Sequence, residues 1–350
     1  MKGKQGLVCM GLLLVLSSCS CHTGKQITAS GLQRKDFQTE VNGQHTDLFT
    51  LSNKQGMEVC ITNYGARVVS ILVPDRNGKR EDVVCGFSTI TEYMEQRQNF
   101  GSTVGRYIGR ILNARFTLDG VEYKLVPNNG KSGHISHGGN PGFADRIWKV
   151  EQADTHRVRL SYLSPDGENG FPGNLKVTLV YSLGEDDNAL DLTYEATTDA
   201  PTVLNLSHHS FFNISGNFTK SVEDQQLWVD ADRFTPYDDK KCVTGEYLPV
   251  AGTPLDFRMP HTIGECIDAD HPQLKVVNGY DHTWELNTKG DDTRPAAWVY
   301  DPASGRKMEI FTTEPGMQIY TGNGLKGKMT GKGGIAYPFR SAVCFETMHF

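Results

Sequence analysis

The sequence predicts an all-β protein, a large antiparallel sandwich or barrel with a few short helices. Three observations support this: a two-residue hairpin signal, long runs that alternate apolar and polar residues, and very little helical periodicity. The hairpin signal is Asp119-Gly120, which separates the β-favouring runs 116–118 and 121–125. An Asp-Gly loop between such runs is among the strongest local indications of a β-hairpin.

Two longer runs, 174–183 and 189–198, alternate apolar and polar residues on either side of an acidic turn at 184–188. Alternation with a period of two is typical of a strand with one buried face. Similar but shorter runs predict further strands at 66–73, 157–163, 226–229, 297–300 and 307–312.

Helical periodicity is confined to two short pieces, 89–97 and 261–267. No Gly- and Pro-rich break divides residues 36–350, and no repeat of fixed period is present. We therefore expect one domain over 36–350.

Residues 202–212 form a β-favouring run that carries two adjacent histidines. Successive side chains of a strand point to opposite faces, so His208 and His209 have different surroundings. His208 shares its face with leucines and Phe212, whereas His209 shares its face with Asn205 and other polar residues. We expect His208 to be a hydrogen-bonded core residue and His209 to be a candidate acid or base, because histidine exchanges protons near neutral pH.

Glu346 lies in a strand-like run, 341–348, and its neighbours on the same face are Ala342, Cys344 and Met348. A carboxyl group among apolar side chains has a raised pKa, which suits a base that works near neutral pH. The competing interpretation is a solvent-facing glutamate at a strand end.

Residues 1–18 have the pattern of an export signal, with two lysines before the apolar run 7–16, which is too short to span a bilayer. The Leu-Ser-Ser-Cys sequence that ends at Cys19 resembles a bacterial lipoprotein cleavage box, and Cys19 would be lipidated. We expect an exported lipoprotein, periplasmic or cell-surface facing, that meets the membrane only through this N-terminal lipid anchor, with residues 19–35 as a tether. The alternative is an ordinary signal peptide with incidental cysteines.

The formal net charge is −6, and it becomes −8 without residues 1–18, whose charges are two lysines. No basic cluster is visible, so no nucleic-acid partner is expected. The eight cysteines are scattered beyond the signal, without Cys-x-x-Cys pairs or nearby histidines, which predicts no zinc site. They fit small buried side chains, although a disulfide of undetermined pairing is compatible with an oxidising compartment.

Five segments along the chain, taken in order, resemble the aldose 1-epimerase (galactose mutarotase) family. The similarity runs from about Asp36 to the end of the chain. The matching segments are Gly105–Ile111, His137–Gly139, Asn205–Gly216, Asn278–His282, and Thr312–Asn323 together with Cys344–Thr347.

This resemblance implies a galactose-mutarotase-like supersandwich and an isomerase that interconverts the α and β anomers of free hexoses such as glucose and galactose. Opening and closing the sugar ring requires an acid and a base, and no metal or organic cofactor is needed. His209 and Glu346 are the implied catalytic pair.

The resemblance also implies residues that bind the sugar. Arg110 would donate hydrogen bonds to it, with Arg106 as the competing candidate. His137 lies in a Gly-rich turn and would bond a sugar oxygen, with His134 as a nearby alternative. Asp281 would accept bonds from two hydroxyl groups.

Three further residues have weaker support. Glu314 occupies a position where some members of the family carry glutamine, and it is expected to assist binding. Phe211 and Tyr320 are candidates for the aromatic surface on which a pyranose packs.

The chain departs from the family pattern in two places. It has Gly109 where family members often have asparagine, which removes one expected contact. It also stops at Phe350, where relatives usually continue with closing strands, so the strand of Glu346 is expected to lack a partner on one side.

These departures motivate a second hypothesis, a non-catalytic carbohydrate-binding lipoprotein of the same fold. A third, an epimerase of phosphorylated sugars, ranks last because it requires additional basic residues around the pocket.

Overall fold

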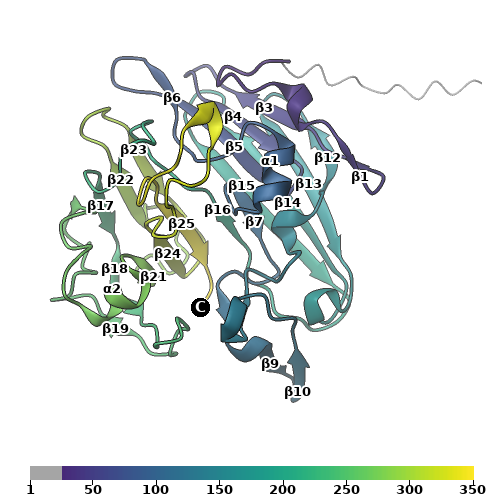
Figure 1. The fold of residues 1–350 in the computed structure, drawn as a ribbon, viewed down its shortest axis with the longest axis vertical. Helices are drawn as coiled ribbons and strands as arrows, with labels where there is room; N and C mark the ends of the chain where they lie inside the picture. The colour runs from purple at the N-terminus through teal and green to yellow at the C-terminus, as the bar shows by residue number, and fades with distance from the viewer. Residues whose placement is uncertain (1–25) are drawn as a thin grey trace, which may run out of the picture.

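The computed structural model describes residues 26–350, which form a protein built mainly from antiparallel β-strands, with two α-helices (Figure 1). The predicted all-β class is therefore confirmed. Neither helix in this part of the chain is long and apolar enough to cross a membrane.

The first half is a sandwich of two four-stranded sheets. Apolar side chains from both sheets form one buried cluster that also contains Trp148 and Phe143. In order across each sheet the strands are β3 (Leu48–Ser52), β4 (Glu58–Thr62), β5 (Arg67–Pro74) and β6 (Arg80–Asp82), and β12 (Lys149–Ala153), β13 (Arg157–Ser164), β14 (Leu175–Leu183) and β15 (Leu190–Thr198).

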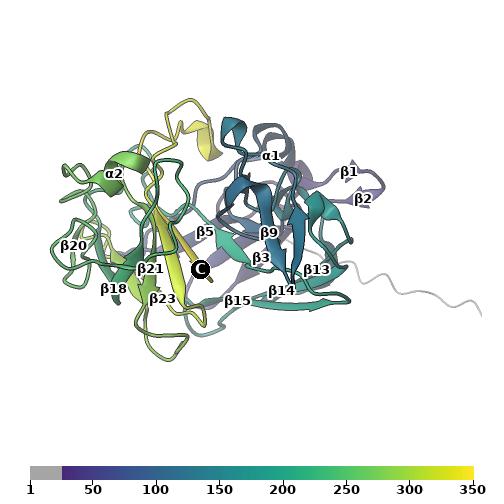
Figure 2. The same ribbon diagram turned by 90° about the horizontal axis from the view of Figure 1, so that it is seen from below.

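The second half contains a five-stranded and a four-stranded sheet around a core that includes Trp284 and Phe234. Figure 2 shows the two halves side by side. In order the strands are β19 (Leu248–Pro249), β18 (Ala231–Thr235), β21 (Asp281–Leu286), β24 (Gly316–Tyr320) and β25 (Cys344–Met348), and β20 (His261–Thr262), β17 (Gln226–Val229), β22 (Ala297–Tyr300) and β23 (Lys307–Ile310).

The segment around Phe212 joins the two halves. Phe212 forms single β-bridges to Val84 of the first half and to Val343 beside β25, and its ring packs against both cores. Just before it, the short strand β16 (Ser207–His209) pairs with β7 (Ser102–Val104). The histidine run therefore lies at the junction between the halves.

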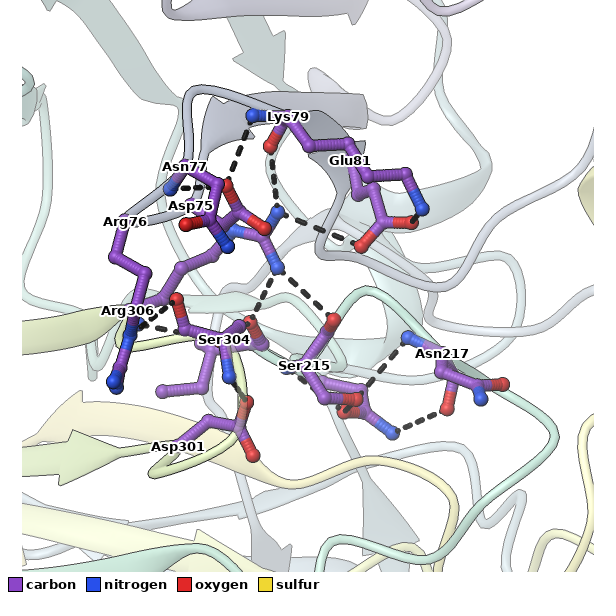
Figure 3. Close-up of polar contacts among 12 residues, drawn as sticks. Asp75, Arg76, Asn77, Lys79, Glu81, Ser215, Asn217, Asp301, Ser304 and Arg306 are labelled. Carbon is purple, nitrogen blue, oxygen red and sulfur yellow. Dashed lines mark hydrogen bonds and ion pairs between the residues drawn. The ribbon is translucent and has the colours of Figure 1, made fainter.

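A polar junction around Arg306 ties the hairpin turns of the two halves together (Figure 3). The buried Arg306 guanidinium donates hydrogen bonds to the carbonyl oxygens of Ile214, Ser215 and Lys79 at 3.0–3.2 Å. Arg76 donates to the carbonyl of Pro302 at 2.8 Å. Because arginine offers several donors in a fixed fork, one side chain satisfies three carbonyls from two segments.

The smaller elements lie around these sheets. Helix α1 (Ile90–Gln96) begins with a capping box in which the Thr89 side chain and the Glu92 side chain satisfy each other's backbone amides. The remaining elements are α1 (Ile90–Gln96), α2 (Pro272–Val277), the strand pairs β1 (Glu40–Val41) with β2 (Gln44–His45), β8 (Arg110–Ile111) with β11 (Ile135–Ser136) and β9 (Arg115–Leu118) with β10 (Val121–Lys124), and 3₁₀ turns at Arg34–Phe37, Leu112–Ala114, Gly130–Ser132, Phe143–Asp145, Glu168–Gly170 and Lys332–Gly334.

Most of the predicted strands are confirmed. The hairpin at Asp119-Gly120 has Leu118 opposite Val121, and both turn residues have positive φ, as a two-residue turn of this kind requires. The predicted helix at 89–97 is α1. The predicted helix at 261–267 is wrong: His261–Thr262 is a strand that pairs with β17, so hydrogen bonds across the sheet prevail over a weak local helical pattern.

The chain is packed before residue 36. Leu32 and Phe37 are buried in a third apolar cluster, and the Glu58 carboxylate of β4 accepts hydrogen bonds from the Ala29 and Ser30 amides. The described part of the predicted tether, residues 26–35, thus lies against the first sandwich. Residues 1–18 and Cys19 lie outside the described residues.

Candidate active site

A pocket lies where one face of the five-stranded sheet meets β16 and the β8–β11 pair. The sheet register explains how distant residues converge: Asp281 of β21 is opposite Tyr320 of β24, and Gln318 is opposite Glu346 of β25. The pocket is lined by Gly109, Arg110, Ser136, His137, His209, Asp281, Gln318, Tyr320 and Glu346.

His209 and Glu346 form a contact pair at the bottom of this pocket. The His209 Nε2 atom lies 3.3 Å from Glu346 Oε1, and the two side chains are 7% and 2% exposed. His209 stacks on the ring of Phe211 and meets the edge of His137. The His209 Nδ1 atom is buried without a hydrogen-bond partner in residues 26–350. The imidazole is therefore held by packing, with its Nε2 atom against the carboxyl group.

Burial sets the protonation of this pair. It lowers the pKa of His209 well below the usual value, with a further contribution from the neighbouring His137. Burial also raises the pKa of Glu346 well above the usual value, and the Asp281 charge adds to this effect while Arg110 opposes it. At neutral pH the His209 imidazole is therefore neutral with a free lone pair, and Glu346 keeps its proton to a higher pH than an exposed carboxyl group does. A neighbouring acid and base of this kind can give one proton and take another.

The structure separates the two arginine candidates. Arg110 lines the pocket, with its guanidinium 5.8 Å from the centre of the Tyr237 ring and one hydrogen bond to the Lys241 carbonyl. Arg106 is 2% exposed and lies elsewhere, in a cage of backbone oxygens. Its donors reach the carbonyls of Ser164, Pro165, Pro172 and Gly173 and the hydroxyls of Ser164 and Thr202. Arg106 is thus a structural residue.

His137 also reaches the pocket. It adopts a positive φ of 52°, and its Nδ1 atom accepts a hydrogen bond from the Gly109 amide. Burial, together with the nearby Arg110, lowers the pKa of His137 to about 4, so its imidazole is neutral. The alternative, His134, is fully buried outside the pocket and accepts a hydrogen bond from the Asn113 amide.

Gly109 lines the pocket beside His137. Its φ is +75°, and a Cβ atom at this position would meet the Met348 methyl group at 3.7 Å, an ordinary contact. The pocket therefore has room for a side chain where this sequence provides none.

Asp281 lies on the sheet side of the pocket, where the Gln318 amide donates a hydrogen bond to it at 2.6 Å. Burial raises the pKa of Asp281 to about 6, although Arg110 and this hydrogen bond both act to lower it. Gln318 also accepts a hydrogen bond from Thr283. It therefore orients the carboxylate as well as facing the pocket.

Replacing Asp281 with Asn is expected to stabilise the fold at neutral pH. The pKa of about 6 in the folded protein lies above the ordinary 3.8. Between these values the folded protein binds a proton that the unfolded chain does not, so stability falls as pH rises through this window. Above it the buried charge costs about 3 kcal/mol, since one pKa unit corresponds to about 1.4 kcal/mol, and the neutral amide avoids this cost.

Urea unfolding at about pH 4 and about pH 7.5 measures this difference. The D281N variant should exceed the wild type in stability at the higher pH and match it at the lower. D224N, on an exposed aspartate, is the control. A D281N variant less stable than the wild type at the higher pH would contradict the prediction.

Two other predicted residues have different surroundings. Glu314 is not among the residues that line the pocket, and its carboxylate pairs with the His349 Nδ1 atom at 2.5 Å. Phe211 lies behind His209 and packs edge-on against Phe100 and Tyr320. Tyr320 itself lines the pocket.

His208 points away from the pocket. Its Nε2 atom lies 2.6 Å from the Ser210 hydroxyl, and its Nδ1 atom lies 3.5 Å from the Tyr181 hydroxyl. The side chain is partly exposed rather than fully buried. The two neighbouring histidines therefore face opposite sides of the strand.

The structure thus brings together Arg110, His137, His209, Asp281 and Glu346. Sequence reasoning missed Gln318 and Ser136. Gln318 had a usable signal, because it lies two residues before Tyr320 and so shares its face in a strand. Ser136 had no such signal, since a serine next to a Gly-rich turn is common in any loop.

The chain matches the family model described as aldose 1-epimerase over residues 47–350. It is 39% identical to the galactose mutarotase of Sus scrofa over 302 residues, which is 86% of this chain and 85% of that protein. It is 36% identical to the aldose 1-epimerase of Escherichia coli K12 over 286 residues, 82% of this chain and 81% of the relative.

The comparison with solved structures agrees with these sequence matches. An aldose epimerase homologue from C. elegans superposes with a TM-score of 0.79 at 30% identity, covering 87% of this chain and 89% of the other. Galactose 1-epimerase from Lactobacillus acidophilus superposes with a TM-score of 0.78 at 29% identity and 89% coverage of both chains.

Proposed function

Because the chain belongs to the aldose 1-epimerase family and is an isomerase that interconverts sugar anomers, we propose that His209 and Glu346 are its catalytic acid–base pair. The observation that carries this proposal is their contact at 3.3 Å in the bottom of the pocket. The substrates that we propose are free hexoses, with glucose and galactose as the first to test.

The reaction needs two proton transfers at one carbon. One member of the pair removes the proton of the C1 hydroxyl while the other protonates the ring oxygen, which opens the ring to the aldehyde. After rotation about the C1–C2 bond, the same groups act in reverse and close the ring on the other face. Both oxygens are attached to C1, so two catalytic atoms that lie this close together can serve both at once.

The remaining residues of the pocket fit a polyhydroxylated ring. Arg110 and neutral His137 offer donors, Asp281 offers acceptors, and Gln318 offers both. The Tyr320 ring provides an aromatic surface at the same pocket. These contacts position the sugar so that C1 faces the catalytic pair.

The other two hypotheses have less support from the site. A binding protein without turnover has no need for a buried histidine and a buried carboxyl group in contact. An epimerase of phosphorylated sugars needs several cations, and among the nine lining residues Arg110 supplies the positive charge.

Polarimetry of freshly dissolved α-D-galactose and α-D-glucose tests the function. The folded protein is expected to accelerate the approach to the anomeric equilibrium above the buffer rate. Saturable sugar binding without acceleration would reject the enzyme in favour of the non-catalytic carbohydrate-binding protein.

For its location we propose an exported lipoprotein anchored through Cys19. The export signal over residues 1–18 and the Leu-Ser-Ser-Cys box support this proposal. Fatty-acid labelling in a bacterial host should label the wild type and not the C19S variant. Equal labelling of the two would reject Cys19 as the anchor.

A further inference from the structure

A cysteine lies beside the catalytic pair and takes no part in the proposed reaction. Cys344 is two residues before Glu346 on β25, so both side chains point to the same face of the sheet. The side chain of Cys344 is fully buried, and the thiol is not among the groups that line the pocket. It therefore lies beside the catalytic pair but outside the lining of the pocket.

The thiol, the imidazole and the carboxyl group are close enough to share an ion. One ligand atom from each of Cys344, His209 and Glu346 lies within 4.8 Å of the other two, and all three residues are buried. In tetrahedral zinc sites, with bonds of about 2.0–2.3 Å, the ligand atoms are about 3.3–3.7 Å apart. The His209–Glu346 distance of 3.3 Å already meets this requirement. The sulfur has to approach by at most about 1.5 Å.

The chemistry of the three groups also suits zinc. Sulfur, imidazole nitrogen and carboxylate oxygen are the ligand types that Zn²⁺ uses in proteins, and hard cations such as Mg²⁺ avoid sulfur. The His209 Nδ1 atom is buried and has no hydrogen-bond partner among the described residues. This nitrogen is not the one beside Glu346, so the zinc ligand that the geometry offers is the His209 Nε2 atom.

We propose that Cys344, His209 and Glu346 form a binding site for Zn²⁺, and that the ion inhibits the enzyme reversibly. Bound zinc displaces the protons of the Cys344 thiol and the Glu346 carboxyl group, which are released to solvent, and it occupies a lone pair of His209, so neither catalytic group can then exchange protons with the sugar. The ion enters through the pocket, because His209 and Glu346 line it, and so it competes with the substrate. The metal site rests on geometry alone, whereas the inhibition rests on the proposed function.

The spacing of the cysteines in the sequence predicted no zinc site. That rule detects ligands that are near one another in the chain. Here β16 and β25 supply the ligands, and they meet only because the Phe212 segment brings the two halves together.

The test combines binding and activity. Co²⁺ added to the wild type is expected to give a sulfur-to-cobalt charge-transfer band in the near ultraviolet, and Cys344→Ala should lack it. Zn²⁺ from a metal buffer should slow galactose mutarotation. More sugar should raise the zinc concentration that is needed for inhibition, and EDTA should restore the rate. Cys344→Ala should need at least about 10-fold more zinc, since even groups that only orient zinc ligands change affinity 10–100-fold.

Cys85→Ala is the matched control, because Cys85 is a fully buried free thiol in the same apolar cluster as Cys344. It should keep both the cobalt band and the zinc sensitivity. If Cys344→Ala does not fold, Cys344→Ser replaces it. A missing cobalt band in the wild type overturns the metal site. Equal zinc sensitivity in the wild type and the Cys344 variant overturns the inhibition through this site. The cobalt result stands whether or not the protein is an epimerase.

Discussion

Replacing Glu346 with Gln is expected to lower kcat for mutarotation by about 10³-fold, the usual contribution of a positioned acid or base. Glutamine matches the shape of the carboxyl group and can still bond to His209, but it cannot exchange a proton. His209→Asn should have a similar effect, because it removes the partner. The double variant should lose little more than either single one, since the two residues act as a unit.

The Glu346→Gln variant should still fold. Glu346 is buried with a raised pKa, so the neutral amide removes no stabilising charge. Polarimetry gives the rate, and thermal unfolding shows that the sample is native. Glu285→Gln is the control, because Glu285 is a carboxylate on the same sheet that pairs with Arg233 outside the pocket. An E346Q variant with more than about a tenth of the wild-type rate would reject Glu346 as a catalytic residue.

Replacing Arg106 with Met is expected to cost about 3–5 kcal/mol of unfolding free energy, because several buried carbonyl groups lose a charged donor. The affected hydrogen bonds include those to Pro172 and Gly173 at 2.7 and 2.8 Å. Methionine fills most of the volume but donates nothing. Arg110→Met should instead leave stability within about 0.5 kcal/mol and raise KM, because Arg110 faces the pocket.

Urea unfolding of the two variants, followed by kinetics on each folded sample, separates the two roles. If Arg106→Met is too unstable to purify, Arg106→Lys should lose less stability, since lysine keeps the charge but lacks the fork of donors. Equal stability losses for Arg106→Met and Arg110→Met would contradict this assignment. An unchanged KM in Arg110→Met would remove Arg110 from the sugar site.

Much of the fold could be predicted because the alternation of apolar and polar residues along a strand shows which of its side chains are buried. The runs 174–183 and 189–198 became β14 and β15 with bounds shifted by a single residue at the N-terminal end. The turn at Asp119-Gly120 could be located because few residues tolerate its backbone conformation. The secondary structure of the segment 261–267 could not be predicted in this way, because its strand forms by pairing with β17, which is distant in the chain.

The sequence by itself determined which kinds of residue form the site and on which face of its strand each one lies. The period of two placed His208 and His209 on opposite faces, and it placed Cys344 with Glu346 on one face. Only the tertiary structure decided which groups meet. It put Arg110 in the pocket and Arg106 in a cage of carbonyls, added Gln318 beside Asp281, and brought His209 against Glu346 and Cys344. The physical reason is that each of these contacts joins strands distant in sequence, and their register and packing depend on the whole core rather than on local pattern.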